Sequence, residues 1–147
     1  MSAHASRLFA ATLAAALWST PLAAKECYAP DARAQERAFS RAVITEGGKV
    51  VWLGGQTGSL TSSFEDQVRE IFGEIEKTIK AVGGTGLKDI TTMTVFITDA
   101  RLGDRLTQIR KEIFKECFPA SALISVSGLA RSGLLIEIQG VAVVGGK

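Results

Sequence analysis

The chain has 147 residues, of which 46% are hydrophobic and 22% are charged, a composition typical of a single soluble globular domain. The formal net charge of +2 is spread along the chain, and no block of lysine and arginine alternates with aromatic residues, so nucleic acid is not an expected partner. The single histidine, His4, stands near the N-terminus, and the two cysteines lack CxxC spacing. The sequence therefore predicts no metal site and no other cofactor.

Residues 1–24 have the pattern of a secretory signal peptide. Arg7 precedes an apolar run from Leu8 to Leu17, and small residues follow. The run is shorter than the roughly 20 apolar residues that span a bilayer, so we expect no permanent membrane anchor. We expect export to the periplasm, and the alternative is an N-terminal extension on a cytoplasmic protein. After export Cys27 and Cys117 could form a disulfide, and buried unpaired cysteines are the alternative.

The segment after the signal peptide is polar and lacks periodicity. Residues 25–37 have a composition typical of a linker or an N-terminal strap, and we expect the folded domain over 38–147. Within that domain, apolar segments at 43–44 and 50–53 flank a turn at 46–49 that contains two glycines. This pattern predicts a β-hairpin.

Periodicity predicts two amphipathic helices and three further strands. Apolar residues spaced three and four apart mark each helix, with Ser62 or Ser63 as the first N-cap, Gly83 as the first stop and Pro119 as the second. The predicted elements are a helix over 64–82, a strand over 90–98, a helix over 102–117 and strands over 120–127 and 134–144, the last two joined as a hairpin.

The resulting order is ββαβαββ, which defines an α+β fold. Because each helix connects two strands, we expect a mixed sheet that is parallel in part and carries both helices on one face. Val, Ile and Phe alternate on both sides of several strands, so the second face should also be covered. With no further elements in the chain, a second copy is the natural cover, and the pattern predicts a homo-oligomer.

Several short segments resemble one known family in their order and spacing. They are Ala38–Val43, Leu53–Gly58, Phe64–Gln67, Thr94–Asp99, Phe118–Ala120 and Leu135–Ile138. Through them the sequence resembles the RidA/YjgF family over about residues 39–144. The resemblance implies a chorismate-mutase-like fold, a homotrimer and a small-molecule ligand at subunit interfaces. The family's deaminases hydrolyse an imine or enamine derived from an amino acid to a 2-oxo acid and ammonia.

The resemblance also assigns candidate site residues. It makes Glu137 the catalytic residue, which orients the attacking water or transfers protons around it. The alternative is that Glu137 is an ordinary carboxylate on a strand. In the family pattern Phe39 replaces the usual tyrosine, and Gly55 shapes the cleft wall together with Gln56. The expected substrate-binding residues are Phe39, Ser40, Gly55, Gln56, Ser121 and Leu123.

One of these positions departs from the family. Ser121 stands where the deaminases carry an arginine that clamps the substrate carboxylate through two hydrogen bonds. A serine offers one neutral hydrogen bond, so we expect poor binding of small 2-imino acids. Arg41 and Arg131 are the candidate replacements, and for both we expect a solvated surface position. The sequence thus supports two hypotheses, an imine or enamine deaminase and a non-catalytic small-molecule-binding or chaperone-like trimer.

Overall fold

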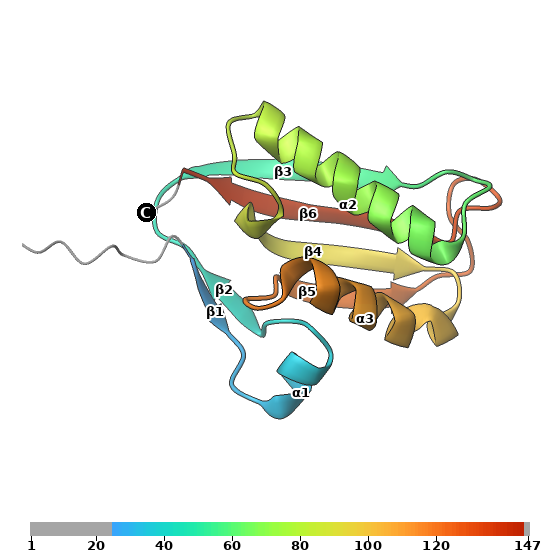
Figure 1. The fold of residues 1–147 in the computed structure, drawn as a ribbon, viewed down its shortest axis with the longest axis horizontal. Helices are drawn as coiled ribbons and strands as arrows, with labels where there is room; N and C mark the ends of the chain where they lie inside the picture. The colour runs from blue at the N-terminus through green and yellow to red at the C-terminus, as the bar shows by residue number, and fades with distance from the viewer. Residues whose placement is uncertain (1–24, 146–147) are drawn as a thin grey trace, which may run out of the picture.

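The computed structural model describes residues 25–145 (Figure 1), so the predicted signal peptide at 1–24 lies outside the described residues. The elements in chain order are β1 (Glu26–Tyr28), α1 (Ala32–Glu36), β2 (Ala42–Ile44), β3 (Lys49–Thr57), α2 (Phe64–Ala81), a 3-10 helix (Leu87–Asp89), β4 (Ile90–Ile97), a 3-10 helix (Ala100–Leu102), α3 (Gly103–Phe114), β5 (Ala120–Ser125) and β6 (Ile136–Val144). From residue 38 onward, the strands and long helices follow the predicted order ββαβαββ.

The central sheet has the strand order β3-β6-β4-β5. β4 and β5 are parallel, whereas β6 is antiparallel to both of its neighbours, so the sheet is mixed as predicted. Both long helices, α2 and α3, lie on one face of this sheet (Figure 1). The sequence pattern suggests a closing hairpin of the last two strands, and this is wrong because β6 lies between β3 and β4. The long β6 satisfies the backbone groups of two strands there, and β5 is left at the edge.

β2 belongs to a separate two-stranded sheet. It pairs antiparallel with β1, so the predicted hairpin with β3 is wrong. Gly47 and Gly48 do take positive φ values of 64° and 85°, but the turn leads into a strand of nine residues, seven of which pair with β6. That ladder satisfies more backbone groups than the three residues of β2 could. Residues 25–37 contain β1 and α1, and we call this segment the strap.

The core fills the space between the sheet and the two long helices. α2 presents its predicted apolar stripe to the sheet, where Ile71 and Ile75 are at most 2% exposed. β4 buries alternate residues on the same side, among them Met93 and Val95. Within residues 25–145 no helix is long and apolar enough to cross a membrane.

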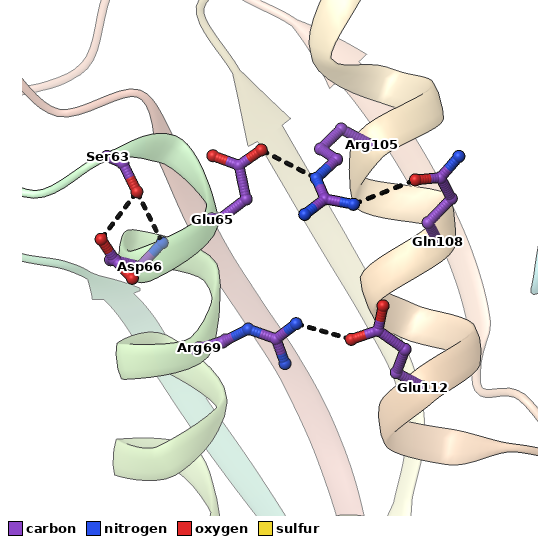
Figure 2. Close-up of polar contacts among 7 residues, drawn as sticks. All are labelled: Ser63, Glu65, Asp66, Arg69, Arg105, Gln108 and Glu112. Carbon is purple, nitrogen blue, oxygen red and sulfur yellow. Dashed lines mark hydrogen bonds and ion pairs between the residues drawn. The ribbon is translucent and has the colours of Figure 1, made fainter.

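Polar contacts on the outer surface join the two long helices (Figure 2). Arg105 of α3 contacts Glu65 of α2 at 2.8 Å, and Arg69 contacts Glu112 at 2.5 Å. Ser63 caps α2 as predicted, because its hydroxyl accepts a hydrogen bond from the amide three residues later. Exposed ion pairs of this kind contribute at most about 1 kcal/mol each, so they align the helices more than they stabilise them.

The face of the sheet opposite the helices is not covered by the described residues. Val50, Trp52 and Ile124 lie on it and are 52%, 81% and 41% exposed. Scattered exposed apolar residues are ordinary, but a tryptophan with apolar neighbours on one sheet face forms a patch. This is the face for which the sequence predicts a second copy.

A disulfide fastens the strap to the segment between α3 and β5. It joins Cys27 to Cys117, whose Cα atoms are 5.3 Å apart. The predicted helical stripe extends to Cys117, but α3 ends at Phe114, and Lys115 and Cys117 have positive φ values of 61° and 49°. This left-handed turn takes Cys117 out of the helix and towards β1. Of the two alternatives for the cysteines, the structure contains the disulfide.

We predict that replacing Cys27 and Cys117 with serine lowers the free energy of unfolding by about 2 to 5 kcal/mol, because the bond joins residues 90 positions apart and constrains the unfolded chain. Urea unfolding followed by circular dichroism measures this loss. As a control, dithiothreitol should lower the unfolding midpoint of the wild type and leave the double variant unchanged. Equal stability of the two proteins under oxidising conditions would contradict a formed disulfide.

Candidate functional site

A cavity of about 270 Å³ lies between the strap, α3 and β5. This volume is near the lower end of the roughly 300 to 1,000 Å³ that small-molecule pockets occupy. Its lining residues are Arg33, Arg37, Phe39, Thr107, Arg110, Ser121 and Leu123. Three of the predicted substrate-binding residues, Phe39, Ser121 and Leu123, are therefore brought together here.

The register of β5 explains why two of them reach the cavity. Ser121 pairs with Met93 of β4, and Leu123 pairs with Val95. Met93 and Val95 are buried under the helices, so Ser121 and Leu123 point to the same side of the sheet. β5 is the edge strand, and α3 lies over this edge and supplies Arg110 (Figure 1).

Arg110 is the buried cation of this cavity. The residue is 3% exposed, and its Nη2 donates hydrogen bonds to the Ala38 carbonyl and, at 2.7 Å, to Ser121 Oγ. Its Nε has no hydrogen-bond partner among the described residues. Burial, with a further contribution from the charge of Arg37, lowers the pKa of Arg110 to about 10. At neutral pH the guanidinium is therefore charged, and both of its acceptors are neutral.

Other arginines differ from Arg110 because carboxylates accompany them. The ion pairs are Arg37 with Asp104, Arg41 with Asp31, Arg69 with Glu112, Arg101 with Asp99, and Arg105 with Glu65. Arg41, one of the two arginines considered from sequence, also lies 5.5 Å from the centre of the Phe39 ring. The other, Arg131, is exposed in the loop after β5.

Sequence reasoning missed Arg110. The signal was its spacing, four residues after Leu106 and seven after Gly103, both of which are buried on α3. Positions at these intervals share one face of a helix, so an arginine there points towards the sheet.

The strap supplies two more arginines. α1 begins after Asp31, whose carboxylate accepts a hydrogen bond from the Ala34 amide at 2.8 Å. Ala34 is fully buried, so the short helix is seated on the domain. Arg33 is exposed, and Arg37 is half-buried and pairs with Asp104 at the start of α3.

Ser40 lies beside the cavity and is not one of its lining residues. It is 2% exposed, and its Oγ donates a hydrogen bond to the Phe118 carbonyl at 2.5 Å. A parallel bridge to Ala120 ties the same residue to the start of β5. In the single chain Ser40 therefore positions the cavity wall.

The predicted catalytic residue lies on the other face of the sheet. Glu137 pairs with Phe96, and its neighbours Ile136 and Ile138 point into the core, so Glu137 faces away from the helices. An irregularity in the pairing of β3 brings Gly55 against it, where a Cβ on Gly55 would lie 2.1 Å from Glu137 Oε1. That position accepts only glycine in this arrangement.

Gln56 follows in the same strand, and its Nε2 donates a hydrogen bond to the Gly54 carbonyl at 3.4 Å. The structure thus gathers the predicted residues into two groups on opposite faces of the sheet. Phe39, Ser121 and Leu123 line the cavity, whereas Glu137 and Gly55 lie together on the uncovered face.

Known proteins resemble the chain over most of its length. The sequence profile of the Endoribonuclease L-PSP family matches residues 29–144. The chain is 30% identical to protein DfrA of Myxococcus xanthus, across 71% of this chain and 84% of that protein. It is 28% identical to the 2-iminobutanoate/2-iminopropanoate deaminase of Homo sapiens, across 73% of this chain and 80% of that enzyme.

Solved structures agree in fold. YyfB, a protein of the conserved Rid family from Yersinia pestis, superimposes with a TM-score of 0.71 at 20% identity and covers 82% of this chain and 99% of its own. A YjgF/YER057c/UK114 family member from Mycobacterium tuberculosis gives a TM-score of 0.61 at 25% identity, across 82% of this chain and 99% of its own.

We predict that Arg110→Met leaves the free energy of unfolding unchanged or raises it. Methionine keeps an unbranched apolar chain and removes a buried charge whose hydrogen-bond acceptors are neutral. Because the folded-state pKa is lowered to about 10, the cost of the charge is fully present below that pH. Above it the native state releases the proton before the unfolded state does, so the wild type gains stability and the advantage of the variant shrinks.

Chemical denaturation at neutral pH and at pH values above 10 measures this difference. The matched control is Arg105→Met, which removes an exposed charge from the same helix and should cost at most about 1 kcal/mol. A loss of several kcal/mol in Arg110→Met at neutral pH would mean that the guanidinium stabilises the fold.

Proposed function

Since the chain belongs to the Endoribonuclease L-PSP family, which is that of the RidA/YjgF proteins, we propose that it hydrolyses reactive imine or enamine intermediates to oxo compounds and ammonia. The observation that carries the proposal is the guanidinium of Arg110 beside Ser121. By resemblance to the family, a carboxylate-binding arginine is expected at position 121. Here Ser121 stands at that position, and the guanidinium of Arg110 reaches it from α3. A substrate carboxylate would give Arg110 a charged partner.

The reaction requires a bound substrate, a water molecule and a side chain that acts as general base and general acid. Arg110 binds the carboxylate and fixes the imine carbon, with Phe39 and Leu123 as the apolar wall. Glu137 accepts a proton from water as the water oxygen adds to the imine carbon, and passes that proton to the nitrogen. Glu137 then moves the hydroxyl proton of the resulting carbinolamine to its nitrogen, the C–N bond breaks, ammonia leaves and the oxygen becomes the carbonyl of the oxo acid.

The complete site in this proposal lies in a cleft between copies of the chain. Glu137 and Arg110 occupy opposite faces of one sheet, so the two groups need different copies in order to meet. Packing of the uncovered face would also bury the apolar patch around Trp52, which is 81% exposed. The assembly we propose is a homotrimer, in which every cleft is equivalent.

We predict that the protein accelerates oxo-acid release from 2-iminobutanoate generated in situ by an amino-acid oxidase. Glu137→Gln should lower kcat by about 100-fold or more, because a positioned acid or base contributes at least that factor. Arg110→Met should lower kcat/KM because substrate binding is lost. Co-expression of the two variants should restore up to about a quarter of the wild-type rate, since mixed assemblies contain clefts with both residues intact. Inactive mixed assemblies would contradict a cleft between copies.

An exchange variant isolates the role of Arg110. Ser121→Arg alone removes a hydrogen-bond acceptor of Arg110 and sets a second cation against it, so the two guanidinium groups should displace one another and kcat/KM should fall. Combined with Arg110→Ser, it moves the guanidinium from α3 to β5 and should restore kcat/KM to within about tenfold of the wild type. Arg105→Met is the control and should behave as the wild type. Oxo-acid binding without any turnover would favour the non-catalytic trimer instead.

We also propose that the protein is exported to the periplasm. The disulfide between Cys27 and Cys117 supports this, because such bonds persist in oxidising compartments. The mature chain isolated from its native host should have the mass of a protein that starts near Lys25. A chain that retains Met1 in the host would contradict export with cleavage.

A further inference from the structure

We propose that Arg33 and Arg37 of the strap form a second anion subsite beside Arg110, so that the site selects imines with two carboxylates. The inference rests on the proposed function, because it assigns the first carboxylate to Arg110. It adds the substrate class, which is the imines derived from acidic amino acids.

The cavity has an excess of positive charge, although Asp104 pairs with Arg37 from outside the lining. Arg33, Arg37 and Arg110 all line it, and none of its seven lining residues is acidic. Arg37 is close enough that its charge contributes to the lowered pKa of Arg110. One carboxylate at Arg110 compensates a single cation, so a second anionic group on the same ligand would still be attracted.

Both strap arginines are available to a ligand. Arg33 is exposed, and no ion pair joins it to a carboxylate within residues 25–145. Arg37 pairs with Asp104, but the two side chains are 37% and 82% exposed. A pair this exposed is worth at most about 1 kcal/mol. A ligand carboxylate held by Arg33 and Arg37 together can therefore displace Asp104.

The strap holds its arginines at the cavity before a ligand arrives. Ala34 and Ala38, on either side of Arg37, are fully buried. The disulfide of Cys27 fastens β1 to the segment that precedes β5. Because the backbone of α1 is already fixed, binding orders only two side chains, which limits the entropy lost on binding.

The cavity of the single chain has room for a small acid. A volume of about 270 Å³ suits imines of about four or five carbons, such as 2-iminosuccinate and 2-iminoglutarate. The carboxylate next to the imine carbon would bind Arg110, and the distal carboxylate would reach the strap arginines. Phe39 and Leu123 would contact the carbon chain between them.

The test compares two imines generated in situ by oxidases for acidic and for neutral amino acids. We expect kcat/KM for 2-iminoglutarate to exceed that for 2-iminobutanoate by about tenfold or more. The double variant Arg33→Gln/Arg37→Gln should lower kcat/KM for 2-iminoglutarate by about tenfold relative to kcat/KM for 2-iminobutanoate, which removes the preference. Arg105→Gln is the matched control, because it removes one exposed arginine that pairs with Glu65 on the outer surface (Figure 2).

Product binding separates this inference from the proposed function. Calorimetric titration with 2-oxoglutarate and 2-oxobutanoate reports the subsite without turnover. If both imines react equally well, or if the double variant lowers both rates equally while its circular dichroism is unchanged, the subsite is overturned and the deaminase stands. If neither imine reacts but 2-oxoglutarate binds about tenfold tighter, and only with Arg33 and Arg37 present, the subsite stands and the deaminase fails.

Discussion

The guanidinium of Arg110 is buried between α3 and β5 and donates hydrogen bonds to two neutral oxygens. A charge in such a place costs several kcal/mol of folding free energy unless a counter-charge accompanies it. The outer arginines of the same fold do have carboxylates, for example Arg69 and Arg105. An apolar side chain at this core-facing position of α3 would stabilise the fold more. Binding of a ligand explains the buried guanidinium better than packing does. An anionic ligand would supply the counter-charge that offsets the free energy of burying it.

The position of that cation depends on three segments distant in sequence. The Ala38 carbonyl comes from the residue that follows the strap, Ser121 from the edge strand and Arg110 from the helix above them. Ser40 ties the chain after the strap to the start of β5 through its bond to the Phe118 carbonyl, and the disulfide closes the same region from the other side. Loosening the strap would therefore move one hydrogen-bond acceptor of Arg110 together with two of the cavity's arginines.

Patterns of neighbouring residues in the sequence predicted the helices and strands, which depend on local interactions. The stripe of α2 and the alternation of β4 depend on neighbouring residues, so periodicity predicted both elements and the buried side of α2. Strand pairing is non-local, which is why the hairpins expected between β2 and β3 and between β5 and β6 are wrong. The family resemblance singled out Ser121, which lines the cavity, but not Arg110, which lies on another element. Its helical spacing was visible in the sequence, although nothing in a single sequence says that α3 lies over β5.

The position of Glu137 and Arg110 on opposite faces of the sheet limits the mechanisms that can use both residues. The register of β6 fixes Glu137 on the uncovered face, where its carboxylate lies over Gly55 in space that a Cβ would occupy. Arg110 is fixed equally firmly on the other face. A four-stranded sheet separates them, and no rotation of side chains brings them to one substrate. If both residues act on one imine, the acid or base must come from another copy. The exposed Trp52 and the open edge of β5 are the surfaces through which such a copy could approach.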